Sequence, residues 1–149
     1  AAAATVGVLQ DVVETDRLNV ISARSMAQAR GIEVTVNEST QLGHPAAVEV
    51  SLGGSMRDLA VSGIGNRDGS ARITRIGGFH VDVMPRRTML VLTNKDVPGV
   101  IGRVGTLLGD AGVNIAEYHQ ARLAQGGDAL AVVAVDGEVP EAVRQALCD

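Results

Sequence analysis

The sequence has 149 residues and a mass of 15.4 kDa, which suits one ordinary domain or two very small ones. Hydrophobic residues make up 46% and charged residues 20%, a composition that supports a buried core and excludes a disordered tail. Thirteen basic and 17 acidic residues give a net charge of -4, which argues against nucleic-acid binding. Phe79 and Tyr118 are the only aromatic residues, so modules that stack on bases are also disfavoured.

The single cysteine, Cys148, excludes an intrachain disulfide and a cysteine-based zinc site. It fits a reducing, cytoplasmic setting. No apolar run approaches the roughly 18 residues of a membrane span, and the opening Ala1–Ala4 lacks the basic start of a signal peptide. Because the chain does not begin with Met, we expect a processed chain or a piece of a larger one.

Residues 1–86 have the pattern of an antiparallel meander accompanied by short helices. One helix is expected around residues 6–9, and a second over Ala23–Arg30, with Ser22 as its N-cap and Gly31 as its stop. Apolar residues then alternate with polar ones between glycine-rich turns. This alternation predicts strands at 32–36, 48–52, 59–61 and 81–83.

Residues 87–149 follow a short linker, Pro85–Arg87, and have a different pattern. Their predicted order is β-α-β-β-α, which is that of a ferredoxin-like unit without its last strand. We therefore expect an α+β fold in two small modules at 1–86 and 87–149, the first truncated at its start and the second lacking its final strand. The predicted parts are a strand at 89–92, a loop at 94–99, a helix at 100–108 closed by Gly109 and Gly112, strands at 113–123 and 129–135 around a turn at 125–128, and a helix at 140–147.

Catalytic and cofactor motifs are missing from the sequence. The two glycine clusters, Gly63–Gly69 and Gly99–Gly105, have the wrong spacing or context for a dinucleotide-binding loop. His44, His80 and His119 have no partners at metal-ligand spacing. No serine or cysteine has the surroundings of a nucleophile, so we predict no catalytic residue and no metal site in this chain.

The loop 94–99 has the groups that recognise an amino acid. Pro98 and Gly99 stand at the start of a predicted helix, whose free amides favour an anion such as a carboxylate. Asp96 can accept a hydrogen bond from an ammonium group, or it can simply cap the helix. Asn94 and Asn114 offer amide groups, and we expect Asn114, at the start of the next strand, to return to the same end of the unit.

The stretch 92–116 resembles an ACT domain. The resemblance rests on Asp96, on Pro98-Gly99-Val100-Ile101-Gly102, on Leu107-Leu108-Gly109 and on Gly112-Val113-Asn114-Ile115-Ala116. It is closest to the C-terminal regulatory ACT domain of the D-3-phosphoglycerate dehydrogenase family. The segments 19–23, 27–34, 61–69 and 79–83 are similar to the intervening, allosteric substrate-binding domain of the long form of that family.

The resemblance implies a regulatory function. Members of that family oxidise 3-phosphoglycerate with NAD in the first step of L-serine biosynthesis, and L-serine inhibits them from a site between two ACT domains. The NAD-binding and catalytic parts would precede residue 1, so no cofactor is expected in this chain. The positions that match the effector contacts are Asn94, Asp96 and Asn114, together with Pro98, Gly99 and Val100; Asn94 departs from the pattern, since relatives have an aromatic residue or His there.

An arginine-rich stretch is the second candidate site. Arg67, Arg72, Arg75, Arg86 and Arg87 lie within 21 positions, and guanidinium groups suit bidentate phosphate contacts. The resemblance implies that the intervening domain binds a phosphorylated effector through such residues. The alternative is an ordinary solvated strand face. The candidate anion-binding residues are Arg72, Arg75, Arg86 and Arg87.

Two other functions remain open at this point. The chain could be the regulatory subunit of an L-serine dehydratase, which shares both kinds of module, or a non-enzymatic ACT sensor for another amino acid. In each case the expected partners are a small amino acid and a second copy of the chain, because ACT units pair symmetrically. Neither nucleic acid nor a membrane is expected as a partner.

Overall fold

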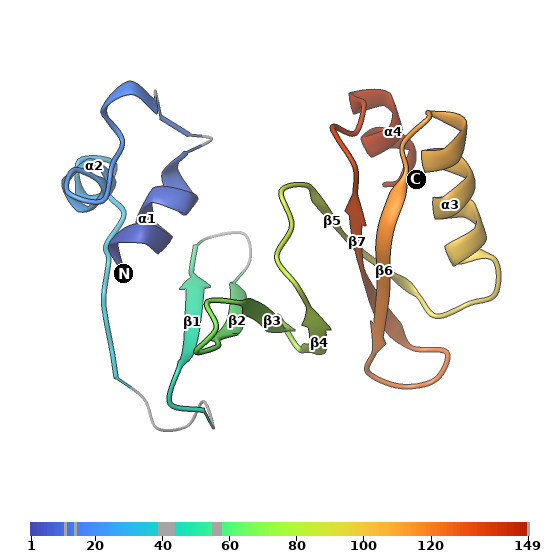
Figure 1. The fold of residues 1–149 in the computed structure, drawn as a ribbon, viewed down its shortest axis with the longest axis horizontal. Coiled ribbons are helices and arrows are strands. Elements are labelled where there is room, and N and C mark those ends of the chain that lie inside the picture. Colours follow the sequence, from blue (N-terminus) through green and yellow to red (C-terminus); the bar gives the residue numbers. More distant parts are fainter. Residues whose placement is uncertain (11, 14, 39–43, 55–57, 149) are drawn as a thin grey trace. The chain divides into compact units, whose positions relative to one another are not determined.

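The computed structural model describes residues 1–10, 12–13, 15–38, 44–54 and 58–148. The chain forms two compact units, Ala1–Gln41 and Leu42–Asp149. The described residues contain no helix that is both long and apolar enough to cross a membrane. The elements are labelled in Figure 1.

The first unit is a small helical body. It contains α1 (Ala2–Leu9), the 3-10 turn η1 (Thr15–Arg17) and α2 (Ala23–Gln28). Helices α1 and α2 contact each other, and Leu9, Ala23 and Ala27 are fully buried. Both predicted helices are therefore present, although α2 ends two residues earlier than expected.

The start of α2 differs from the prediction in its capping group. Ser22 occupies the N-cap position, but its side chain makes no capping hydrogen bond. Instead, the Ser22 hydroxyl donates to the Arg17 carbonyl at 2.6 Å, while Asn19 Oδ1 accepts from the backbone N–H groups of Ile21 and Ser22. Gly31 follows the helix with φ 74°, as expected for a helix stop.

The strand predicted at residues 32–36 is wrong. Residues 32–38 have no regular secondary structure, and no described strand pairs with them. Alternating apolar side chains make a segment suitable for a sheet, but a strand forms only when neighbouring backbone satisfies its N–H and C=O groups. The segment does alternate between apolar and polar residues, but no described strand lies beside it to pair with its backbone.

A four-stranded antiparallel meander begins the second unit. Its strands are β1 (Ala47–Leu52), β2 (Leu59–Gly65), β3 (Ala71–Ile76) and β4 (Phe79–Val83), in the order β1-β2-β3-β4. The pairing of β2 with β3 shifts at Gly63. A Cβ at Gly63 would lie 2.8 Å from the Arg72 carbonyl oxygen, so this irregularity requires glycine.

The rest of the second unit has the predicted β-α-β-β-α order. It consists of β5 (Met89–Lys95), α3 (Val100–Asp110), β6 (Ile115–Arg122), β7 (Asp128–Val135) and α4 (Glu141–Ala146). The three strands form an antiparallel sheet in the order β5-β7-β6. Strand β5 runs two residues into the predicted loop because Asn94 and Lys95 pair with Ala129 and Asp128. Helix α3 likewise continues through Gly109, and Gly112 beyond it has φ 70°.

Strand β7 is buried on both faces. On one face Ala131, Val133 and Val135 pack with α3, through Val104 and Leu108, and α4 completes this core. On the other face Leu130 and Val132 pack against Ile76, Val81 and Val83 of the first sheet. Figure 1 shows β7 between β5 and β6, with α3 and α4 on one side of the sheet. This two-sided burial explains why β7 is a continuous apolar run.

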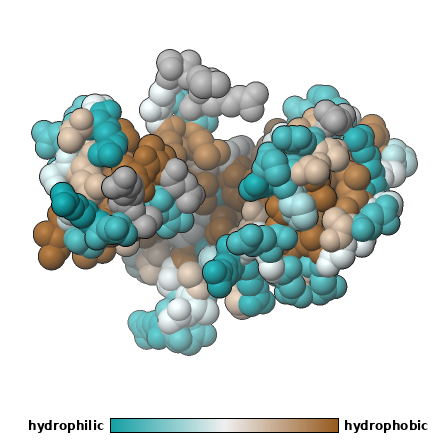
Figure 2. All heavy atoms as spheres, turned by 90° about the horizontal axis from the view of Figure 1, so that it is seen from above, coloured by the Kyte–Doolittle hydropathy of each residue, from teal (hydrophilic) through white to brown (hydrophobic). Residues whose placement is uncertain are grey.

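Apolar side chains also reach the surface near the start of α3. Val97 and Ile101 are each 54% exposed, and Leu123, just after β6, is 61% exposed. In Figure 2, apolar residues appear among the polar ones on the face seen there. Val97 and Ile101 belong to the region that contains the candidate site.

Candidate functional site

A cleft of about 490 Å³ opens at the start of α3. Three segments line it: the loop and first turn, residues 96–101; Gln120 and Arg122 of β6; and Gln125 and Gly126 of the β6–β7 hairpin. The structure thus brings Asp96, Pro98, Gly99 and Val100 together in one cleft, and the hairpin closes its other side.

The helix end in this cleft has no side-chain cap. Gly99 is the N-cap residue, with φ 95°, and it makes no side-chain capping hydrogen bond. The Arg103 N–H donates to the Gly99 carbonyl and starts the helical hydrogen-bond series. The amides before Arg103 are therefore available at the positive end of the helix, an arrangement that favours a carboxylate or another anion.

Asp96 ties the loop to the β6–β7 hairpin and does not cap the helix. Its Oδ2 accepts from Arg122 Nη1 at 3.0 Å and from the Gly126 N–H at 3.2 Å. Its Oδ1 accepts from Gln120 Nε2 at 3.2 Å. The hydrogen bond from Arg122, followed by that from Gly126, lowers the pKa of the Asp96 carboxyl below its ordinary value. Asp96 is therefore a carboxylate, held in a fixed position, at neutral pH.

Among the described residues, three polar atoms of this sheet are buried without a hydrogen-bond partner: Asn94 Oδ1, Gln120 Oε1 and the Tyr118 hydroxyl. Asn94 uses its Nδ2 to donate to the Lys95 carbonyl at 2.6 Å. Burial raises the pKa of the Tyr118 hydroxyl. Asn94 does not line the cleft but lies beside it, on β5, in the residue row of Ala129 and Arg122.

Asn114 lies at the opposite end of the sheet from Asp96, so the expectation that it returns to the same end of the unit is wrong. Its Nδ2 donates to Asp136 Oδ2 at 2.7 Å, and its carbonyl accepts from the Asp136 N–H. Arg122, which holds Asp96, pairs with Ala129. Ala129 and Asp136 are seven residues apart, which is about 23 Å along an extended strand.

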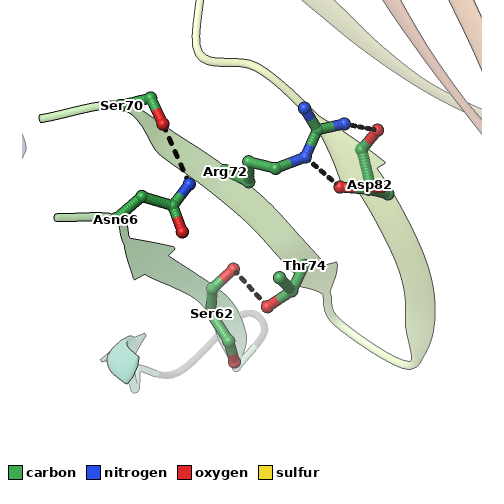
Figure 3. A network of polar contacts seen from close by, with 6 residues as sticks. All are labelled: Ser62, Asn66, Ser70, Arg72, Thr74 and Asp82. Atoms are coloured by element: carbon green, nitrogen blue, oxygen red, sulfur yellow. Dashed lines mark hydrogen bonds and ion pairs between the residues drawn. The ribbon is translucent and has the colours of Figure 1, made fainter. Parts of the chain in front are cut away.

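The first two arginines of the predicted anion site are paired with carboxylates of the same sheet. Arg72 forms an ion pair with Asp82, and its Nη2 also donates to the Asp82 carbonyl at 3.0 Å. Figure 3 shows the Arg72 side chain reaching across to Asp82. Arg75 forms an ion pair with Glu49. The pKa of Glu49 is lowered by the hydrogen bond from Ser62 and then by Arg75.

Arg86 and Arg87 lie between the two sheets in sequence, and both are exposed. Among the described residues no ion pair is recorded for either of them. The four predicted anion-binding arginines therefore have different surroundings: Arg72 and Arg75 have carboxylate partners, whereas Arg86 and Arg87 face solvent. Within the described ranges, no group of three or more His, Cys, Asp and Glu side chains could hold a metal ion.

Sequence reasoning missed Gln120, Arg122 and the hairpin residues of the cleft. Positions 118, 120 and 122 alternate on one face of β6, and Tyr118 packs against the helix-side core. That periodicity places Gln120 and Arg122 on the same face as α3. It was visible in the sequence, but their distance to Asp96 depends on the pairing of β5, β7 and β6, which the pattern does not reveal.

Comparisons with known proteins agree with this architecture. Residues 88–149 match the ACT domain family. Over most of its length the chain is also similar to proteins named D-3-phosphoglycerate dehydrogenase. The protein from Synechocystis sp. is 31% identical over 140 residues, which is 93% of this chain and 25% of the relative. The protein from Bacillus subtilis is 29% identical over 131 residues, 87% of this chain and 25% of the relative.

A third relative, from the archaeon Methanocaldococcus jannaschii, has the same name and is 28% identical over 128 residues, 85% of this chain and 24% of the relative. The chain therefore spans about a quarter of the length of the curated relatives it matches. Residues 88–149 are an ACT domain, and the chain that contains it is homologous to part of the D-3-phosphoglycerate dehydrogenases.

Proposed function

We propose that this chain is the regulatory region of an NAD-dependent D-3-phosphoglycerate dehydrogenase, and that its ACT domain binds L-serine as a feedback inhibitor. The observation that carries the proposal is the cleft at the start of α3, which lies within the matched ACT segment. The similarity over 85–95% of the chain to proteins named D-3-phosphoglycerate dehydrogenase supports the choice of enzyme.

The cleft complements both charges of an amino acid. The uncapped first turn of α3 offers amides to a carboxylate, and Asp96 offers an anionic acceptor to an ammonium group. Arg122 neutralises part of the Asp96 charge, so a simple cation gains little in this cleft, whereas a zwitterion also gains the contact of its carboxylate with the first turn of α3. The exposed apolar side chains of Val97 and Ile101 lie at the same end of the helix, where a short aliphatic part of a ligand can contact them.

A second copy of the chain is expected to complete the site. Asn114 lies at the end of the sheet away from Asp96, so one chain alone does not bring the two together. A two-fold axis perpendicular to the strands reverses the strand direction in the second copy. Such pairing places Asn114 of one copy beside the Asp96 end of the other, and it creates two equivalent sites in each dimer.

The proposal predicts that ligand binding and dimerisation are coupled. Calorimetric titration of the 149-residue chain with L-serine should show one ligand per chain, with weaker binding of glycine, L-alanine and D-serine. L-serine should also shift the chain towards a dimer in sedimentation velocity experiments.

The matched variants are Asn114→Ala and Asn37→Ala. Asn114→Ala should weaken L-serine binding at least about tenfold, the loss of one or two hydrogen bonds to a charged ligand. Asn37 is an exposed asparagine of the first unit, and its replacement should leave binding unchanged. A folded wild-type chain that binds none of the four amino acids at millimolar concentration would refute the proposed effector site.

A further inference from the structure

The Gln120 amide is satisfied at only one of its two ends. Its Nε2 donates to Asp96 Oδ1 at 3.2 Å, whereas its Oε1 is buried and has no hydrogen-bond donor among the residues that the structure describes. Gln120 lines the cleft at the start of α3. Buried acceptors are normally paired, because leaving one unpaired costs much more than a typical hydrogen bond contributes.

The orientation of this amide is fixed by its neighbour. An ionised carboxylate such as Asp96 only accepts hydrogen bonds, so Gln120 must turn its NH₂ group towards Asp96 and its oxygen away. Reversing the amide would place two oxygen acceptors against each other. The Arg122 guanidinium already donates to the other oxygen of Asp96. In the described contacts, Gln120 Oε1 therefore remains an unpaired acceptor.

The donor that this position fits is a cationic one. Gln120 and Asp96 both line the cleft and are joined by a hydrogen bond, so Gln120 Oε1 and the Asp96 carboxylate are neighbouring oxygen acceptors. An ammonium group has three N–H donors and no acceptor, so it can satisfy both residues at once. A hydroxyl group in its place has one donor, and it also directs lone pairs towards these oxygens.

We propose that Gln120 Oε1 accepts a hydrogen bond from the primary ammonium group of the amino-acid effector, and that Gln120 thereby selects amino acids over the corresponding hydroxy acids. The ligand carboxylate then lies towards the first turn of α3. This inference rests on the proposed effector function of the same cleft, and it adds the residue that reads the amino group.

The decisive comparison uses two ligands that differ only in this group. L-glycerate has a hydroxyl where L-serine has its ammonium. Titrated into the 149-residue chain, L-serine should bind at least about tenfold more tightly than L-glycerate, because a charge-assisted hydrogen bond and an ion pair are replaced by a weaker contact. Equal affinities for the two ligands would overturn the proposal without any substitution.

The variant Gln120→Met keeps the length of the side chain and removes the acceptor. It should lower L-serine affinity at least about tenfold and bring the affinities for L-serine and L-glycerate closer together. Removing the unpaired acceptor offsets the loss of the hydrogen bond that Gln120 Nε2 donates to Asp96, so the urea midpoint of the ligand-free variant should stay close to that of the wild type. The control, Gln28→Met, makes the same replacement at an exposed position of α2, outside the cleft, and should leave both affinities unchanged.

The outcomes separate the two levels of the proposal. If the wild type binds L-serine but Gln120→Met binds it equally well, the role of Gln120 is refuted and the effector site stands. A fall in the free energy of unfolding of ligand-free Gln120→Met well above the roughly 1 kcal/mol of the lost hydrogen bond to Asp96 would indicate a structural role and would also refute the assignment. If the wild type binds neither ligand, the proposed function fails, and the inference about Gln120 fails with it.

Discussion

Replacing Val132 with alanine tests whether the two sheets share a core. Val132 is 2% exposed and packs with Val81 and Val83 of β4, on the face of β7 that lies opposite the helices. Its cross-strand neighbour on β5 is Val91, which is 50% exposed. The two residues have the same chemistry and directly adjacent positions, but only one of them is in the contact between the sheets.

The expected cost follows from the burial of the two side chains. Val→Ala removes two methyl groups, worth about 1.6 kcal/mol when fully buried at about 0.8 kcal/mol each. The cavity left behind raises the cost for Val132 to about 2–3 kcal/mol. Val91 loses about half the transfer free energy, roughly 0.8 kcal/mol, and leaves no closed cavity. Any loss of strand propensity is common to both and cancels in the difference.

Urea unfolding of the wild type, Val132→Ala and Val91→Ala provides the measurement. The free energy of unfolding should fall by at least about 1 kcal/mol more in Val132→Ala than in Val91→Ala. A difference within about 0.5 kcal/mol, the usual range for surface substitutions, would mean that the face of β7 carrying Val132 is not packed against β4 in solution.

Three further predictions concern single residues. Tyr118→Phe removes a buried hydroxyl that has no hydrogen-bond partner in the described part of the chain, so the free energy of unfolding in urea should stay unchanged or rise by up to about 1 kcal/mol. A fall of that size would show that the hydroxyl has a partner. Gly63→Ala places a Cβ against the Arg72 carbonyl and should lower the free energy of unfolding by about 1–3 kcal/mol in the same assay, whereas an unchanged value would show that the register shift relaxes. The pKa of Asp96 is lowered by Arg122 in the folded chain, so the ionised carboxylate contributes fully to stability above about pH 4, and this contribution is lost as the pH falls through the folded-state pKa. In Asp96→Asn, the free energy of unfolding should therefore depend less steeply on pH on the acid side. An unchanged slope would contradict the ion pair between Asp96 and Arg122.

The sequence was most informative where the pattern is local. The order of strands and helices in residues 87–149 and the turn glycines Gly31 and Gly112 follow from periodicity and backbone chemistry within a few residues. The strand prediction for residues 32–36 was wrong because a strand needs a neighbouring strand as well as alternating apolar residues. Ser22 occupies the predicted N-cap position, but its side chain does not cap the helix, because its hydroxyl donates to the Arg17 carbonyl instead.

The candidate site shows a different limit. Asp96, Pro98, Gly99 and Val100 could be predicted because they are neighbours in sequence and share the start of one helix. The position of Asn114 was predicted wrongly, although the chain order contains the answer: α3 carries the chain back along the sheet, so β6 starts at the end where β5 started. Gln120 depends on long-range strand register, which local periodicity does not determine.

The packing of β7 between two cores has a consequence for dissecting the molecule. The linker at residues 85–87 is an obvious place to cut the chain, since it separates the two sheets in sequence. An isolated fragment starting after that linker would keep its helices but lose the side chains that cover Leu130 and Val132. It would expose an apolar sheet face flanked by Met89 and Ala121, which is a surface prone to self-association. If such a fragment forms oligomers, they could arise from the newly exposed sheet face as well as from natural pairing of ACT domains. The oligomeric state is therefore best measured on a chain that retains the first sheet.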